Sequence, residues 1–194
     1  MADNTLHIKN MVCDRCIMVV ENILDTLRIP FADVQLGNVQ LQKPLPETTK
    51  ETLKQKLHAL GFELLESRKN ILTEKIKNLI IQHVQYTDEP LPVNISTYLT
   101  SHLHSDYSLL SHTFSETENM TIEQYTILQK IEKIKELLSY GEMTLTQIAD
   151  LMGYANVAYL SAQFKKQTGI SPSQYKKEHS LPRKPLDKVR SYKW

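Results

Sequence analysis

The sequence predicts an α+β domain with the element order β-α-β-β-α-β, followed by an all-α domain. Three observations predict this organisation. Hydrophobic spacing switches between period 2 and period 3.6 over residues 5–66, and helical spacing alone fills 94–178. The segment TDEPLPVN (87–94) interrupts the pattern with two prolines. We therefore expect a first domain over 1–68, a connecting helix and proline-containing linker over 69–93, a helical domain over 94–180 and a basic tail over 181–194.

The elements of the first domain follow from local patterns. Residues 5–9 (TLHIK) alternate as a strand does, and residues 14–27 have helical periodicity. Two alternating segments flank Gly37-Asn38, which predicts a hairpin with its tight turn at that pair. A helix begins after Pro46 and ends at Gly61, and FELLES forms the last strand. This order is the split ferredoxin-like plan. Its predicted core includes Ile17, Met18, Val20, Ile23, Leu24, Leu27, Leu53, Leu57 and Leu60.

The helical part begins with an amphipathic helix over 70–86. Residues 94–119 and 144–169 then share one plan, a short helix, a tight turn and a second helix, with a long helix over 121–141 between them. Leu110 and Phe114 of the first segment match Leu160 and Phe164 of the second, and capping-box patterns occur at Thr121/Gln124, Thr144/Gln147 and Ser171/Gln174. Each segment therefore has the features of a helix-turn-helix unit, whose second helix can enter a DNA major groove.

The second segment also resembles a known family. The series Ala149, Gly153-Tyr154, Leu160, Phe164-Lys165, Gly169, Ser171-Pro172 and Tyr175 is similar to the signature of the bacterial AraC/XylS-type transcription regulators. The resemblance extends over about residues 90–178. It implies two helix-turn-helix units that are held by the linking helix and read adjacent major-groove segments of double-stranded DNA. It also implies a sequence-specific regulator, often an activator that contacts RNA polymerase.

The resemblance assigns DNA-reading positions to two recognition helices. The helices run near 107–117 and 156–167, and neither contains an arginine to bind guanine through two hydrogen bonds. Readout then depends on methyl contacts, hydrogen bonds from serine or histidine, and DNA shape, while Lys165 and Lys166 are candidates for phosphate contact. The expected outward residues are Tyr107, Ser108, Ser111 and His112 on the first helix and Asn156, Val157, Ala158, Ser161 and Ala162 on the second.

Cys13 and Cys16 are the only cysteines of the chain, and their C-x-x-C spacing is typical of three chemistries. A structural zinc site requires four ligands, and a redox pair of this kind belongs to a thioredoxin fold. Two thiolates can instead hold a soft monovalent ion. The pair lies between a predicted strand and helix, where the helix N-terminus favours thiolate.

The residues around this pair, Ile8 to Cys16, resemble the G-M-x-C-x-x-C loop of heavy-metal-associated domains, and Ala59 to Glu63 resembles their approach to the last strand. The resemblance implies Cys13 and Cys16 as ligands of Cu(I), Zn(II) or Cd(II), with Met11 as apolar support. Asn10 replaces the family's glycine, and Asp14-Arg15 place charges between the ligands. A thiol switch and an inert remnant of a metal site remain alternatives.

Composition and charge limit the classes of function that the protein can have. The formal net charge is +1, but residues 160–194 hold nine lysines and arginines against two acidic residues, which favours contact with phosphate or acidic surfaces. We expect a cytoplasmic protein without a membrane span, because no apolar run is long enough and no secretion signal is visible. No catalytic set is evident, so we expect no enzyme. The alternative to a regulator, with or without homodimer formation, is a metal chaperone whose helical half docks a partner.

Overall fold

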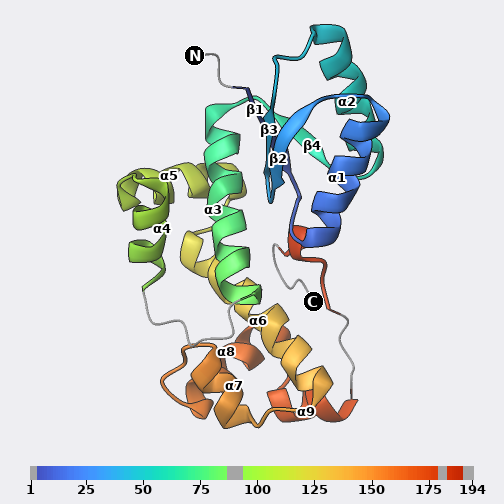
Figure 1. Ribbon diagram of the computed structural model, residues 1–194. Coiled ribbons are helices and arrows are strands. Elements are labelled where there is room, and N and C mark those ends of the chain that lie inside the picture. Colours follow the sequence, from blue (N-terminus) through green and yellow to red (C-terminus); the bar gives the residue numbers. More distant parts are fainter. Residues whose placement is uncertain (1–3, 87–93, 179–182, 190–194) are drawn as a thin grey trace. The chain divides into compact units, whose positions relative to one another are not determined.

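The computed structural model describes residues 4–86, 94–178 and 183–189 (Figure 1). Two compact units divide the chain between Asn78 and Leu79, within helix α3 (Arg68–Gln85). The first half of α3 thus belongs to the first unit, where Glu74 accepts a hydrogen bond from the backbone N–H of Asn10 at 2.9 Å. Residues 87–93 of the expected linker, and 181–182 and 190–194 of the expected tail, lie outside the described residues.

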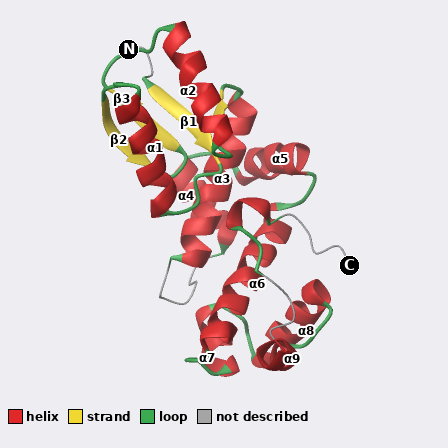
Figure 2. Cartoon of the chain, turned by 90° about the vertical axis from the view of Figure 1, so that its right-hand side faces the viewer, coloured by secondary structure: helices red, strands yellow, loops and turns green. Residues whose placement is uncertain are grey.

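The first unit has the predicted element order. It contains β1 (Thr5–Lys9), α1 (Asp14–Thr26), β2 (Phe31–Gln35), β3 (Asn38–Leu41), α2 (Glu47–Ala59) and β4 (Glu63–Leu65). The sheet has the order β2-β3-β1-β4, and every neighbouring pair is antiparallel. Figure 2 shows α1 and α2 on one face of this sheet. Their buried side chains, which include Val20, Leu24, Leu53 and Leu57, form the core with Ile8 and Val39.

Two residues predicted to lie in this core are exposed instead. Met18 is 66% exposed and Leu60 is 58% exposed. Met18 lies about 200° around α1 from Val20, at 100° per residue, so it points away from the sheet. Leu60 follows the last residue of α2 as its C-cap, so the helical spacing that would align it with Leu57 has ended. The predicted positions of Met18 and Leu60 were therefore wrong.

The hairpin turn is shifted by one residue from the prediction. Gln35 pairs with Asn38, so Leu36 and Gly37 form the turn and Asn38 begins β3. Gly37 has a φ of +84°, a conformation that favours glycine. A Cβ at this position would lie 2.1 Å from Nδ2 of Asn78, which donates a hydrogen bond to the Leu36 carbonyl. The turn thus joins the sheet to the first half of α3.

The second unit is helical in its described parts. It contains α4 (Ile95–Leu103), α5 (Tyr107–Glu118), α6 (Ile122–Tyr140), α7 (Leu145–Leu151), α8 (Val157–Thr168) and α9 (Pro172–Glu178), followed by a short 3-10 helix, η1 (Leu186–Lys188). The capping boxes predicted at Thr121 and Thr144 are confirmed, and Ser171 and Gln174 make the same reciprocal hydrogen bonds. Within the described ranges, no helix combines the length and apolar character that a membrane span needs.

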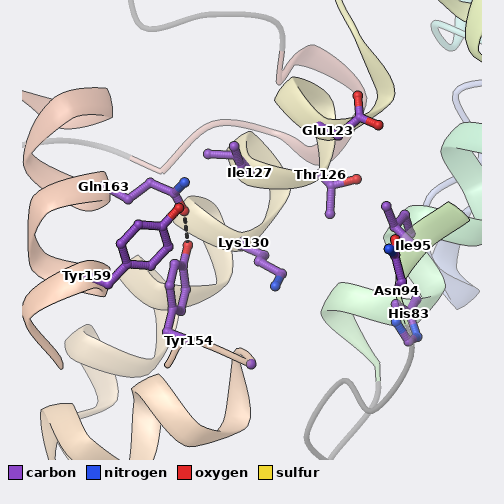
Figure 3. Close-up of a pocket in the computed structure, with 11 residues that line it drawn as sticks. His83, Asn94, Ile95, Glu123, Thr126, Ile127, Lys130, Tyr154, Tyr159 and Gln163 are labelled. Carbon is purple, nitrogen blue, oxygen red and sulfur yellow. Dashed lines mark hydrogen bonds between the residues drawn. The ribbon is translucent and has the colours of Figure 1, made fainter. Parts of the chain in front are cut away.

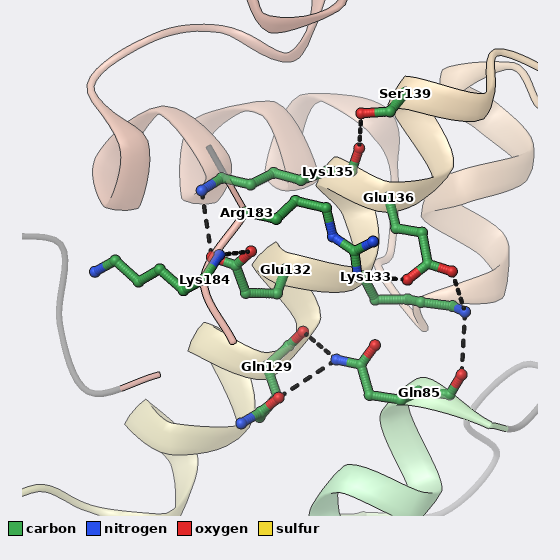
Figure 4. Close-up of polar contacts among 9 residues, drawn as sticks. All are labelled: Gln85, Gln129, Glu132, Lys133, Lys135, Glu136, Ser139, Arg183 and Lys184. Atoms are coloured by element: carbon green, nitrogen blue, oxygen red, sulfur yellow. Dashed lines mark hydrogen bonds and ion pairs between the residues drawn. The ribbon is translucent and has the colours of Figure 1, made fainter. Parts of the chain in front are cut away.

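The described part of the basic C-terminal segment lies on α6 (Figure 4). Arg183 pairs with Glu136 at 2.6 Å, and the backbone N–H of Lys184 donates to Glu132 at 3.0 Å. Glu132 also pairs at 3.2 Å with Lys135, and both side chains are fully buried. Because a buried carboxylate needs several donors, the C-terminal segment helps to satisfy the charge on the central helix.

Candidate nucleic-acid interface

The second unit contains two helix pairs that repeat at an offset of 50 residues. We call α4–α5 the first helix pair and α7–α8 the second. Leu110 and Leu160 are 50 residues apart and both fully buried, as are Phe114 and Phe164. Phe114 contacts Tyr125 with ring centroids 5.5 Å apart, and Phe164 contacts Tyr175 at 5.7 Å. The N-caps also match, Asn94 with Thr144 and Asp106 with Asn156. The two pairs are therefore built on one plan.

The second helix pair has a small residue in its core and a glycine in its turn. Ala149 is buried together with Ile148, which lets the helices approach closely. Gly153 has a φ of +67° directly after α7, and the side chain of Asn156 then caps α8 by accepting from the backbone N–H of Tyr159 at 2.8 Å. These features fix the direction in which α8 leaves the turn.

The outward face of α8 carries most of the residues predicted for it. Ala158, Ala162, Lys165 and Lys166 are exposed, and Ser161 is half-buried. Asn156 is exposed at the helix start, although its side-chain oxygen is the N-cap. Val157 is half-buried and packs against the apolar core of the second pair, so it faces inward in part.

The matching face of α5 is polar and uncharged at its start. Ser108 and His112 are exposed, and Ser111 is half-buried. Tyr107 is half-buried, and its hydroxyl donates a hydrogen bond to the carboxylate of Glu123. Burial first, and then the bond to Glu123, raise the pKa of Tyr107 above its ordinary value. Tyr107 therefore ties α5 to the start of α6.

Two exposed residues were not predicted for the interface, and two exposed lysines were predicted only as part of the basic C-terminal segment. Leu109 on α5 and Tyr159 on α8 occupy matching places and are 54% and 58% exposed. Lys176 and Lys177 are exposed on α9. The 50-residue repeat was the signal that could have found Leu109 and Tyr159, because it aligns them with each other outside both apolar stripes.

The two helix pairs differ sharply in charge. Residues 78–129, which include the whole first pair, contain no lysine or arginine. The exposed lysines of the second pair and α9 align, at the 50-residue offset, with residues of other types. Nonspecific affinity for DNA comes mainly from cations that neutralise phosphates, so these lysines are the candidates for it. The aligned positions are Ser115 with Lys165, Glu116 with Lys166, Thr126 with Lys176 and Ile127 with Lys177.

The cysteine pair lies in the first unit, at the start of α1. Cys13 is the N-cap residue, and its Sγ atom is 3.5 Å from that of Cys16. Burial opposes ionisation of Cys13, but hydrogen bonds from the Cys16 backbone and thiol, together with the Arg15 charge, outweigh it and lower the pKa. Burial and the neighbouring Cys13 raise the pKa of Cys16. The pair thus combines one thiol that ionises readily with one that does not.

The loop before the pair is held by specific contacts. Asn10 has a φ of +71°, a left-handed conformation that glycine and asparagine adopt most readily. Its side chain donates to the Gly61 carbonyl at 2.8 Å, and Met11 beside it is fully buried. The described ranges contain no group of three or more His, Cys, Asp and Glu side chains placed to hold a metal ion. Cys13 and Cys16 alone offer two sulfur ligands close together.

A family model for a helix-turn-helix domain matches residues 99–178, which include α5 and α8. This chain is 33% identical over 85 positions to the HTH-type transcriptional activator RhaR of Pectobacterium carotovorum, covering 44% of this chain and 30% of that protein. It is 27% identical over 123 positions to the arabinose operon regulatory protein of Escherichia coli, covering 62% of this chain and 42% of that protein. The C-terminal half holds a helix-turn-helix domain of the AraC/XylS type. The chain spans less than half the length of these two relatives.

A third relative matches over more of this chain. It is an uncharacterized HTH-type transcriptional regulator in the cgkA 5' region of Pseudoalteromonas carrageenovora, 28% identical over 167 positions. The match covers 83% of this chain and 95% of that protein. Because residues 79–194 make up about three fifths of the chain, this match extends into the first unit. At least part of the first unit therefore matches this relative together with the helical unit.

Proposed function

We propose that the protein is a sequence-specific DNA-binding transcription regulator. The observation that carries the proposal is the repeated helix pair, whose second copy presents small exposed side chains between a capped turn and two exposed lysines. A recognition helix of this kind reads base edges, while neighbouring cations hold the phosphates. The kinship of residues 99–178 with helix-turn-helix regulators supports the same function.

The two helix pairs have different tasks in this proposal. Lys165 and Lys166 on α8, with Lys176 and Lys177 on α9, bind phosphates and provide most of the affinity. The first pair has no such cations, so α5 contributes base contacts through Ser108, Ser111 and His112, and Tyr107 through its ring. On α8, base contacts come from Ala158, Ser161, Ala162 and the free amide nitrogen of Asn156, with Val157 at the edge of the face. Both helices then read adjacent major-groove segments.

Selection from a pool of random duplexes tests this function. The full chain is expected to enrich one sequence motif in the presence of 200 mM salt and competitor DNA, because base contacts survive conditions that weaken phosphate contacts. A pool that remains random after repeated rounds would show that the helical half docks a protein partner instead, as a metal chaperone with a docking module would.

We propose further that the first unit is a ferredoxin-like, heavy-metal-associated type of domain whose Cys13 and Cys16 bind a soft metal ion. The 3.5 Å separation of the two sulfur atoms supports this, because one ion bound at about 2.3 Å from each can contact both. The left-handed Asn10 and the buried Met11 also fit a loop in which the family has glycine and methionine. Cu(I) suits a two-sulfur site best, whereas Zn(II) and Cd(II) would need ligands from a second copy or from solvent. The positive charge of the bound ion would change the conformation of the loop before α1.

Calorimetric titration of Cu(I), Zn(II) and Cd(II) into the full chain tests the metal site. Wild type is expected to bind one of them, and the Cys13→Ser/Cys16→Ser variant is expected not to. Equal heats of binding for the two proteins would refute the metal site and leave a thiol switch or an inert remnant of a metal site as the alternatives. For the whole regulator, we also propose RNA polymerase as a partner, formation of a homodimer and a cytoplasmic location.

A further inference from the structure

A cavity in the second unit contains a lysine from α6. It has a volume of about 430 Å³ and is formed by the start of α4, one face of α6 and the turn and helix of α7–α8. Figure 3 shows Lys130 between Tyr154, Tyr159 and Gln163 on one side and Ile95 on the other. Cavities of this size hold small organic molecules in other proteins.

Lys130 has no carboxylate partner among the described residues. Its Nζ donates to the Met152 carbonyl at 2.7 Å and lies 5.3 Å from the centre of the Tyr154 ring. Two of its three protons are left for other acceptors, and burial lowers its pKa. By contrast, the buried Lys77 and Lys135 each lie 3.2 Å from a glutamate. An ammonium that is largely removed from water without a counter-ion is unfavourable, so an anion at this place would stabilise the protein.

The remaining wall is apolar and aromatic with a polar end. Ile95, Ile127 and the ring of Tyr159 line it, and the Tyr154 hydroxyl donates to the Gln163 side chain at 2.5 Å. His83 is also part of the wall. Burial first, and then the charges of Lys130 and His102, lower its pKa. Near neutral pH His83 thus adds a hydrogen-bonding group rather than a second cation.

Glu123 is the acidic residue of the cavity, and it lies seven residues before Lys130 on α6. Its carboxylate already accepts the hydrogen bond from Tyr107. Two turns of helix separate the two residues, so they mark a negative and a positive end about 10 Å apart along the axis. An anion would therefore be attracted to the Lys130 end.

We propose that this cavity binds a small organic anion, with its carboxylate or phosphate at Lys130 Nζ and its apolar body against Ile127 and Tyr159. Such a ligand would contact α6 and α8 at once. Because Tyr159 and Gln163 belong to α8, the ligand would alter the position of the DNA-reading helix. That last consequence rests on the proposed function, whereas binding of the anion does not.

Thermal unfolding of the full chain tests the proposal with benzoate and phenyl phosphate as probes and uncharged benzamide as the control. A ligand at ten times its Kd raises the Tm of a chain of this size by about 3–6 °C. We expect such a rise with benzoate or phenyl phosphate at about 10 mM, and none with benzamide. Lys130→Met is expected to remove the rise, and Lys130→Arg to keep part of it because the charge remains. Lys75→Met, at an exposed lysine on α3, is expected to respond as wild type does.

Three results would overturn the proposal: no shift with either anion, an equal shift with benzamide, or an unchanged shift in Lys130→Met. In a separate arm without probes, DNA affinity is measured against salt for wild type and Lys130→Met. If the anions do not bind and the variant lowers the salt slope by about 0.9, Lys130 contacts a DNA phosphate instead. If wild type binds DNA but neither anion, this inference alone is refuted, and if wild type binds the anions but no DNA, the regulator is refuted.

Discussion

The charge difference between the helix pairs leads to a quantitative prediction for DNA binding. Each neutralised phosphate adds about 0.9 to the slope of log K against log salt, so the four exposed lysines of α8 and α9 predict a slope of about −3.6. Between 50 and 200 mM salt, wild type would then lose about 150-fold in affinity, since this is a fourfold change in salt raised to that power. Lys165→Ala/Lys166→Ala would have a slope of about −1.8 and lose about 12-fold.

Fluorescence anisotropy with a labelled duplex carrying the selected motif measures these slopes. The matched control is Ser115→Ala/Glu116→Ala, which changes the aligned positions of the first helix pair. Because those residues carry no positive charge, this control is expected to leave the slope unchanged. A wild-type slope in Lys165→Ala/Lys166→Ala, or an equally reduced slope in the control, would show that these lysines do not provide the phosphate contacts.

Three further predictions concern folding and thiol chemistry. Gly37→Ala is expected to lower the free energy of unfolding, measured in urea, by about 1–2 kcal/mol because of the positive φ, and by a further amount because the new Cβ would meet Asn78. Gly61→Ala is the control, because Gly61 has a φ of +85° and a Cβ there would have nothing within 4 Å. Equal losses of stability in the two variants would contradict the close contact with Asn78. Glu132→Gln breaks the buried pair with Lys135 and is expected to cost about 3–5 kcal/mol, while Glu136→Gln, whose partners Lys133 and Arg183 are partly exposed, costs less. Near neutral pH, Cys13 is expected to react with iodoacetamide faster than Cys16, because its pKa is lowered and that of Cys16 is raised. Raising the pH should narrow the difference between the two reaction rates as Cys16 ionises, and Arg15→Ala should slow the reaction of Cys13. Mass spectrometry of the labelled peptides measures both rates, and a faster reaction of Cys16 would contradict the prediction.

Much of the architecture could be predicted because it is encoded locally. The strand at Thr5–Lys9 agrees with the prediction, and helices α5 and α6 begin and end within one residue of the predicted limits. Capping boxes at Thr121 and Thr144 mark helix starts through residues only three positions apart. Hydrophobic spacing and caps depend on neighbours along the chain, so a single sequence contains enough information to locate them.

The features that were missed depend on distant residues. The turn at Leu36–Gly37 was assigned one position late, and its fit against Asn78 brings together residues far apart in the sequence. The contacts of Arg183 and Lys184 with α6 join residues about 50 positions apart. That no carboxylate of the described ranges pairs with Lys130 also depends on how distant helices pack. Exposed Tyr159 on α8 is a different case, because comparison of the two repeats could have found it.

Hydroxyl-radical footprinting of the selected duplex shows whether both helix pairs contact DNA. Two protected segments are expected on one face of the DNA, with centres about one helical turn (10–10.5 base pairs) apart. Protection of the segment under α8 should weaken more steeply with salt in wild type than in Lys165→Ala/Lys166→Ala. A single protected segment that persists unchanged when the α5 residues Ser108 and His112 are replaced by alanine would contradict the claim that both helix pairs read DNA.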